Sequence, residues 1–256
     1  MFIRYQDRFR NRAAELLFAI ENRLDRIMQG WLLLAGLACA ARIAWNPLRG
    51  PVDPLTIGPY LLLILAPFAS MVVAMRWFVD ADRMPQPSFR LARIGRWLPT
   101  DLESARKHSL YGAGGIMVSL LIGMLLNVPI RALEYLAALP ALAGPIPSWL
   151  ADLSLLMTLD VVIFTSLYTI AFIAALRRVP LFPRLLVAIW FCDLTMQVVI
   201  SKIVAHAPGL PSDVGAALNT LLEGNMQKVL ISAGVWLPYL LFSKRVNVTY
   251  RHRLRR

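Results

Sequence analysis

Two aspartates lie near the middle of long apolar stretches, Asp160 within residues 149–176 and Asp193 within residues 185–204. A charged side chain inside a membrane-spanning helix is costly to bury, and such residues commonly belong to proton relays, ion sites or charge pairs. Gln197 follows Asp193 by one helical turn, so both side chains are expected on one face, where they can share hydrogen bonds. These three residues are the first candidates for a functional site.

Two lysines could supply the compensating positive charge. At a rise of about 1.5 Å per residue, Asp160 lies roughly 24 Å, Lys202 roughly 28 Å and Lys228 roughly 23 Å from the inner end of its helix. Asp193, at roughly 15 Å, lies deeper and nearer the midplane. We therefore expect Asp160, Lys202 and Lys228 to meet in the outer half of the bundle.

Three interpretations of this polar set stay open. A charge-compensated cluster could hold three helices in register. A proton or ion site of the transporter type is the sharper alternative, although the sequence contains no convincing internal repeat. Exposure of the charges to a water-filled vestibule is the third.

The histidines and cysteines lack the spacing of a catalytic or metal-binding site. His108, His206 and His252 lie far apart, and Cys39 and Cys192 both lie inside apolar stretches. The sequence contains no Gly-rich phosphate loop, nucleophile elbow or zinc-binding helix motif. It therefore predicts no enzymatic activity, no metal site and no cofactor. An enzyme acting on lipid headgroups is the weakest alternative.

The composition is that of a membrane protein. Of the 256 residues, 58% are hydrophobic and 16% are charged, and the mean hydropathy is +0.59. A soluble domain is about a quarter charged. The net charge of +12 comes from basic residues at the ends of apolar stretches. Since these residues form no basic patch interleaved with aromatics, no nucleic-acid partner is expected.

Six stretches approach the length of about 20 apolar residues that a membrane-spanning helix needs. They cover residues 30–45, 55–78, 110–128, 149–176, 185–204 and 229–242. The sequence therefore predicts an all-α integral membrane protein with six transmembrane helices. We expect four segments: an amphipathic interfacial helix over 1–28, a two-span hairpin over 29–80, a basic loop over 81–108 and a four-span domain over 109–256.

Arginine and lysine alternate in number between the connections of these spans. Along the chain, the tails and connections hold 6, 2, 7, 1, 3, 2 and 6 of them, which accounts for all 27. Basic residues concentrate on the cytoplasmic side of bacterial membranes. We therefore expect a protein of the bacterial inner membrane with both termini and the two basic loops in the cytoplasm, and with Arg131 in an outer connection.

The first 28 residues have apolar side chains at three- and four-residue steps with charged ones between them, which predicts an amphipathic helix. This helix could lie on the inner surface of an anionic bilayer, or it could dock on a partner protein through the same stripe. Residues 89–98 predict a second short interfacial helix. Thr100 and Glu103 have capping-box spacing, which predicts that the third spanning helix begins in the cytoplasm.

Two motifs resemble a known bacterial membrane family. Residues 181–185 read Leu-Phe-Pro-Arg-Leu, and residues 236–246 read Trp-Leu-Pro-Tyr-Leu-Leu-Phe-Ser-Lys-Arg-Val. Over about residues 111–253 the chain resembles the family named domain of unknown function 2569, with Gly114-Gly115 as its opening pair and Thr249-Tyr250 as its closing pair. Asn247 and Ile116 depart from that family, which usually has Lys and Trp there. The resemblance implies a four-span membrane unit and supplies no activity.

The motif at residues 236–246 also has a physical interpretation. Pro238 removes a helical hydrogen bond and predicts a kink near the inner end of the last span. Tyr239 could anchor the helix at the interface, and Ser243, Lys244 and Arg245 mark the boundary with the cytoplasm. The motif could serve as an anchoring sequence only, or it could contact a lipid headgroup or a partner.

These features favour a non-catalytic inner-membrane protein, an accessory or assembly subunit that interacts with another membrane complex as well as with the lipid bilayer. The alternative is a small ion- or proton-coupled transporter or channel that uses Asp160, Asp193, Lys202 and Lys228.

Overall fold

The computed structural model describes residues 2–45, 54–88, 97–142 and 146–255. Its long helices are α1 (Phe2–Asn22), α2 (Leu24–Ala44), α3 (Pro54–Trp77), α5 (Met117–Ala138), α6 (Ser148–Leu176), α7 (Phe182–Ala205) and α8 (Ser212–Phe242). The shorter elements are the 3-10 helix η1 (Ala81–Arg83), α4 (Leu102–Lys107), α9 (Lys244–Arg251) and the strands β1 (Trp97–Pro99) and β2 (Arg253–Arg255). The described part of the chain is thus all-α apart from one short strand pair.

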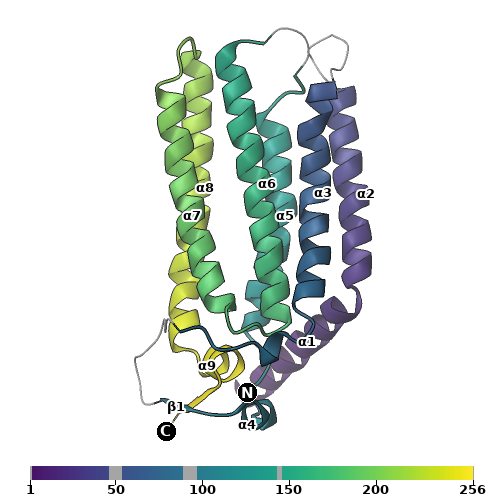
Figure 1. Ribbon diagram of the computed structural model, residues 1–256, viewed down its shortest axis with the longest axis vertical. Coiled ribbons are helices and arrows are strands. Elements are labelled where there is room, and N and C mark those ends of the chain that lie inside the picture. The colour runs from purple at the N-terminus through teal and green to yellow at the C-terminus, as the bar shows by residue number, and fades with distance from the viewer. Residues whose placement is uncertain (1, 46–53, 89–96, 143–145, 256) are drawn as a thin grey trace.

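The long helices α2, α3, α5, α6, α7 and α8 run side by side as a bundle (Figure 1). All of them except α8 are long and apolar enough to cross a membrane, and α8 meets the same test together with α9. The bend between α8 and α9 at Ser243 is 71°. The prediction of an all-α, multi-pass membrane protein is therefore confirmed, with 5 spans, or up to 6, among the described residues.

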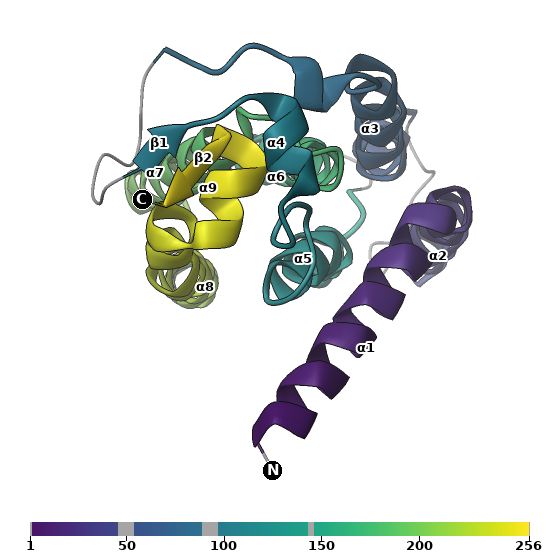
Figure 2. The ribbon, with the colours of Figure 1, turned by 90° about the horizontal axis from the view of Figure 1, so that it is seen from below.

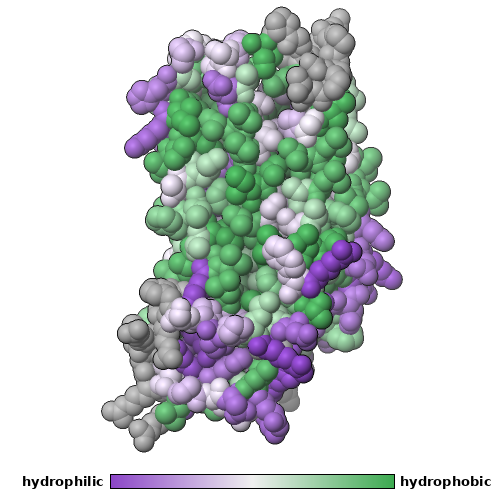
Figure 3. Space-filling view, viewed as in Figure 1, coloured by the Kyte–Doolittle hydropathy of each residue, from purple (hydrophilic) through white to green (hydrophobic). Residues whose placement is uncertain are grey.

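One end of the bundle carries α1, α4, α9 and both strands, and we call it the basic end (Figure 1). Hydrophobic residues cover the middle of the bundle, and hydrophilic residues gather at the basic end (Figure 3). Large apolar side chains such as Leu34, Leu133 and Ile231 are exposed in this hydrophobic band. An apolar surface of this kind matches the hydrocarbon core of a bilayer.

Helix α6 lies inside the bundle and packs against α3, α5 and α7 (Figure 2). Two clusters of buried apolar side chains surround it, and both mix the first two spans with the later ones. One cluster joins Met71 of α3 with Phe172 of α6, and the other joins Leu63 of α3 with Ala132 of α5 and Val161 of α6. The N-terminal hairpin and the later four helices therefore share their cores.

The predicted N-terminal helix is present as α1, although it ends at Asn22 rather than at residue 28. The chain turns at Arg23 into α2, and α1 extends across the basic end and beyond the bundle (Figure 2). Ile20 packs against the bundle core, whereas Leu16 and Phe18 are exposed. The apolar stripe of α1 thus covers the bundle on one side and leaves apolar surface open on the other.

The third span differs from the prediction of residues 110–128. It runs from Met117 to Ala138 as α5 and continues through Pro129 and Arg131. Gly112 and Gly115 separate it from α4, with φ angles of 103° and 65°. Such left-handed backbone costs glycine no strain and interrupts a helix. The prediction that the third span begins at the capping box was therefore wrong.

The short helix α4 begins here instead, and its N-cap is Asp101 rather than the predicted Thr100. The Oδ2 atom of Asp101 accepts a hydrogen bond from the backbone N–H of Ser104 at 3.0 Å. This bond satisfies a backbone N–H in the first turn of α4, which has no acceptor within the helix. The same bond holds the pKa of Asp101 below its ordinary value, so the cap is ionised at neutral pH.

The interfacial helix predicted over residues 89–98 is wrong at its end, because Trp97 and Leu98 belong to β1. Strand β1 pairs antiparallel with β2, with Leu98 opposite Leu254. Residues 89–96 lie outside the described residues. The strand pair ties the connection after α3 to the C-terminal tail, and no local sequence pattern predicts so distant a pairing.

Candidate functional site

Three charged side chains from three helices meet inside the bundle. Arg131 of α5 donates from Nη2 to Oδ1 of Asp193 on α7 at 2.6 Å, and its Nη1 lies 3.4 Å from Oδ2 of Asp160 on α6. Arg131, Asp160 and Asp193 are only 7%, 5% and 0% exposed. The partner of the two aspartates is therefore an arginine that the charge pattern assigned to an outer connection.

Two neutral side chains complete this site. The Nε2 atom of Gln197 donates to Oδ1 of Asp160 at 2.9 Å and lies 3.4 Å from Oδ1 of Asp193. The hydroxyl of Tyr168 donates to Oδ2 of Asp193 at 3.1 Å. Asp193 and Gln197 thus share one face of α7, as their spacing indicates. We call Arg131, Asp160, Tyr168, Asp193 and Gln197 the Arg–Asp–Asp cluster.

Helical spacing explains how these side chains converge. Asp160, Phe164 and Tyr168 follow one another at four-residue steps along α6, as do Asp193 and Gln197 along α7. Residues four apart lie on one face of a helix. The ring of Phe164 faces the arginine, whose guanidinium carbon lies 4.9 Å from the ring centroid. This cation–π contact orients the guanidinium between the two carboxylates.

The Arg–Asp–Asp cluster carries an uncompensated negative charge. Its one guanidinium and two carboxylates sum to −1 when all three are ionised. The Oε1 atom of Gln197 is buried and has no hydrogen-bond partner among the described residues. Burying net charge in a low-dielectric interior is costly, and one bound proton or monovalent cation would remove that charge. Binding of one proton or monovalent cation would therefore neutralise the cluster.

A small cavity reaches the cluster from the side of α8. It has a volume of about 110 Å³, and its polar lining comes from Asn127, Tyr168, Lys228 and Ser232. The Nδ2 atom of Asn127 is buried and meets no acceptor in the part of the chain that the structure describes. A polar space of this size can hold ordered water. Because the Tyr168 hydroxyl also donates to Asp193, water in this cavity would lie one hydroxyl away from a buried carboxylate.

The two predicted lysines do not belong to the cluster. Lys202 is exposed on α7, and Lys228 of α8 forms an ion pair with Glu134 of α5. The prediction that Asp160 meets both lysines was therefore wrong. Axial height along a helix places a residue at a depth, but it does not determine toward which neighbour the side chain points.

Sequence reasoning missed Arg131 and Tyr168. Arg131 was assigned to a connection because Pro129 interrupts the apolar stretch two residues earlier. A usable signal was present, since residues 132–139 are apolar apart from Glu134 and the two aspartates needed a buried cation. Tyr168 lies two helical turns from Asp160 on the same face, which periodicity alone indicates.

The segment that holds the Gly114-Gly115 pair meets the segment of Arg245 and the Thr249-Tyr250 pair at the basic end. The Nη1 atom of Arg245 donates to the carbonyl oxygen of Gly112 at 3.2 Å, and the backbone N–H of Gly112 donates to Oγ1 of Thr249 at 3.0 Å. Tyr250 is fully buried, and its hydroxyl donates to the carbonyl oxygen of Ala175 at 2.8 Å. Arg245, Thr249 and Tyr250 therefore join α9 to the segment before α5 and to the end of α6.

The remaining motif residues lie around the end of α8. This helix continues through Pro238 to Phe242, and the chain changes direction at Ser243, where the backbone is extended. Tyr239 packs edge-on against Trp236, with ring centroids 5.8 Å apart, and Lys244 is exposed. The change of direction thus occurs at Ser243, after the proline.

Buried Arg251 has an uncharged partner on the same helix. Nη1 of Arg251 donates to Oδ1 of Asn247 at 3.2 Å. Burial and the nearby charges of Arg184 and Arg253 lower the pKa of Arg251 to about 10, so this arginine is still charged at neutral pH. A lysine at position 247 would place a second positive charge beside it. Asn247 supplies an acceptor instead.

Comparison of the chain with protein-family models, curated proteins and solved structures finds no match. The similarity to domain of unknown function 2569 rests on the motif residues and stays a prediction. Among the described residues, no group of three or more His, Cys, Asp or Glu side chains is arranged to hold a metal ion.

Proposed function

We propose that this protein is a small proton- or cation-coupled transporter whose coupling site is the Arg–Asp–Asp cluster. The observation that carries the proposal is the net charge of −1 that Arg131, Asp160 and Asp193 leave in the interior of the bundle. Ionisable groups buried at membrane depth commonly belong to proton and ion pathways. Because the cluster joins three helices, ion binding there can be coupled to movement of those helices.

Uptake of a proton would change what holds α5, α6 and α7 together. A protonated Asp160 or Asp193 is neutral, so its attraction to Arg131 falls, and its new O–H needs an acceptor. The buried Oε1 of Gln197 is an acceptor in the same cluster that has no partner within the described ranges. Proton binding can therefore rearrange the hydrogen bonds at the contact of three helices without leaving a buried donor unsatisfied.

Proton flux into proteoliposomes under an imposed pH gradient tests this proposal. Asp193→Asn should abolish the flux, because the cluster then sums to zero charge and no longer needs a proton. Lys202→Gln is a matched control on the same helix α7, since Lys202 is exposed and outside the cluster. Absence of flux in the parent protein under pH, sodium and potassium gradients would overturn the proposal, as would full activity of Asp193→Asn.

We further propose that the protein lies in a bacterial inner membrane with its basic end in the cytoplasm. Both termini lie at the basic end (Figure 1), where Arg12 of α1 and the basic residues of α4 and α9 lie. The placement of Arg131 inside the bundle removes one basic residue from the opposite connections, which strengthens the charge asymmetry that orients membrane proteins. A fluorescent protein fused after Arg256 should fluoresce, whereas alkaline phosphatase there should be inactive; the reverse result would contradict this orientation.

A second candidate function is that of an accessory subunit of another membrane complex. It is favoured by α1, which extends beyond the bundle (Figure 2) and exposes Leu16 at 49% and Phe18 at 69%. Crosslinking in membranes followed by purification in mild detergent should then recover one reproducible partner. Leu16→Ser with Phe18→Ser should remove that partner and leave flux unchanged, so the two candidate functions can be told apart.

A further inference from the structure

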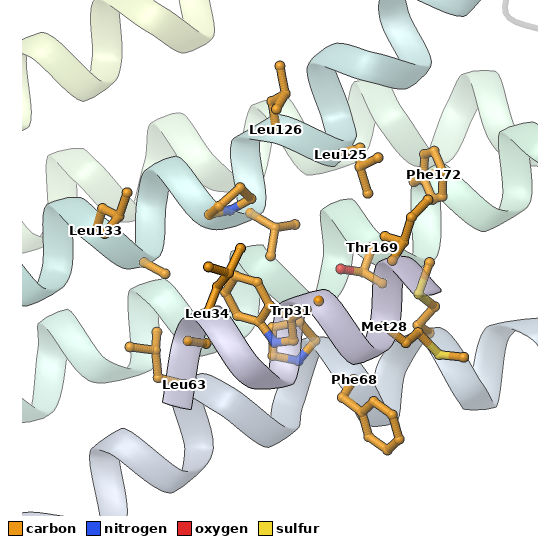
Figure 4. A pocket seen from close by; sticks show the side chains of 18 of the residues that line it. Met28, Trp31, Leu34, Leu63, Phe68, Leu125, Leu126, Leu133, Thr169 and Phe172 are labelled. Carbon is orange, nitrogen blue, oxygen red and sulfur yellow. The ribbon is translucent and has the colours of Figure 1, made fainter. Parts of the chain in front are cut away.

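A second and larger cavity lies on the other side of α5, away from the cavity at Tyr168. It has a volume of about 490 Å³ and is lined by α2, α3, α5 and α6. Its wall is made by Trp31, Leu63, Phe68, Leu125 and Phe172 together with other apolar side chains (Figure 4). This volume falls within the range of about 300–1,000 Å³ that is usual for small-molecule sites.

The cavity is long and opens sideways. Its lining runs along α2 from Ile27 to Ala38 and along α5 from Met124 to Leu136, a length of roughly 16–18 Å at the rise of an α-helix. Leu34 belongs to the lining and is nevertheless 71% exposed. The opening therefore lies in the hydrophobic band of the surface, where the hydrocarbon chains of a bilayer would surround the protein.

The two polar side chains of the lining, Trp31 and Thr169, already have partners among the described residues. Trp31 already donates from Nε1 to the carbonyl oxygen of Ile64 at 2.9 Å. The hydroxyl of Thr169 donates to the carbonyl oxygen of Thr165 at 2.7 Å. Water has no partners in such a space, and a polar headgroup or peptide backbone would lose its hydrogen bonds there. The occupant must be an apolar chain.

An added transmembrane helix does not fit this description. Helices α2 and α5 already contact each other, and a helix with its side chains is about 10–12 Å across. Insertion of such a helix would separate α2 from α5. A hydrocarbon chain is thin enough to lie between them.

Positive charge at one end of the cavity favours a lipid with a negatively charged headgroup. Ile27 and Met28 line the cavity where α2 begins, and Arg23 and Arg26 are exposed within one turn of them, with Asp25 between. The pair of arginines outweighs this aspartate, because the other nearby carboxylate, Glu21, pairs with Arg178 at 3.8 Å. Basic side chains at the surface of a membrane attract anionic lipids.

We propose that this cavity binds one acyl chain of an anionic phospholipid, with the headgroup at the basic end beside Arg23 and Arg26. The site needs neither the orientation nor the transport activity proposed above. It is formed by the apolar faces of α2 and α5, whereas the Arg–Asp–Asp cluster lies between α5, α6 and α7. Its test therefore succeeds or fails independently of a flux measurement.

Native mass spectrometry of the full-length protein in mild detergent tests the binding. Phosphatidylglycerol and phosphatidylcholine with identical chains are the probes. One phosphatidylglycerol should bind per chain in preference to phosphatidylcholine. Ala38→Phe, which fills the cavity, should weaken that binding about ten-fold or more, and Ala40→Phe is the matched control because Ala40 is exposed on the same helix. Arg23→Gln with Arg26→Gln should reduce the preference for phosphatidylglycerol and leave chain binding intact.

A measurement on the parent protein avoids any dependence on variant folding. Phosphatidylglycerol with a photoreactive acyl chain should label residues that line the cavity, such as Trp31 and Ala35 of α2 and Leu136 of α5, in preference to Leu33 and Leu37. Uniform labelling of the outward surface, including Leu33 and Leu37, would overturn the proposal. Equal lipid binding by Ala38→Phe and the parent would overturn it too, as would the finding that a second copy of the chain or a partner helix covers this opening.

Discussion

The Arg–Asp–Asp cluster and the apolar cavity lie on different sides of the same helix, α5. Arg131 contributes a buried charge that is held by two carboxylates, while its neighbour Ala132 lines the cavity. The first region is held by directional contacts that few other side chains could replace. The second has no directional contact to offer, and its shape alone selects an occupant. One membrane helix thus carries a buried ion pair on one side and the wall of an apolar cavity on the other.

The two regions also differ in how they tolerate change. In the cluster, loss of one partner leaves the others buried and charged, which costs several kcal/mol. In the cavity, side chains already face an empty space on one side, so truncation removes few contacts. Three experiments break or sharpen this difference, and they follow from the largest expected effect to the smallest.

Removal of the shared cation should have the largest effect. Arg131→Met leaves Asp160 and Asp193 buried together without their partner and should lower the free energy of unfolding by about 3–5 kcal/mol. Thermal unfolding in detergent measures the loss. The triple variant that adds Asp160→Asn and Asp193→Asn should recover most of it, because no buried charge is left unpaired. Equal loss in the single and triple variants would show that packing of the arginine, and not its charge, matters.

Truncation of apolar side chains should separate the packed core from the cavity. Leu121→Ala removes a fully buried core side chain and should cost about 2–5 kcal/mol. Leu34→Ala at the mouth of the cavity should cost less than about 1 kcal/mol, because that side chain is 71% exposed and leaves no new closed void. Chemical unfolding of both variants in the same detergent gives the comparison. A similar cost at both positions would mean that the cavity is closed by contacts with lipid or protein.

Two tyrosines provide the finest distinction. Tyr168→Phe removes a hydroxyl that donates to Asp193 at 3.1 Å, and Tyr135→Phe removes one that pairs with the neutral Oγ1 of Thr158 at 2.8 Å. Each should cost about 1 kcal/mol, with a larger cost at Tyr168 because its partner is charged. Only Tyr168→Phe should slow proton flux. Equal flux in both variants would contradict a role of the Tyr168 hydroxyl in proton transfer to Asp193.

Local patterns in the sequence predicted the helices well. Apolar stretches of sufficient length predict membrane-spanning helices, because a backbone in lipid must satisfy its own hydrogen bonds, and α2, α3, α6 and α7 follow from this rule. The amphipathic period predicted α1. Four-residue spacing placed Asp193 and Gln197 on one face, and the cost of charge at membrane depth singled out Asp160.

The tertiary structure decided the partners of these residues. Arg131, and not Lys202 or Lys228, meets the aspartates, because the rotation and neighbours of each helix depend on packing along its whole length. The strand pair β1–β2 and the contact of Arg245 with Gly112 join segments that are far apart in the chain. Hydropathy and periodicity are local properties, so they determine which elements form, whereas the pairing of a buried charge depends on how all the helices pack together.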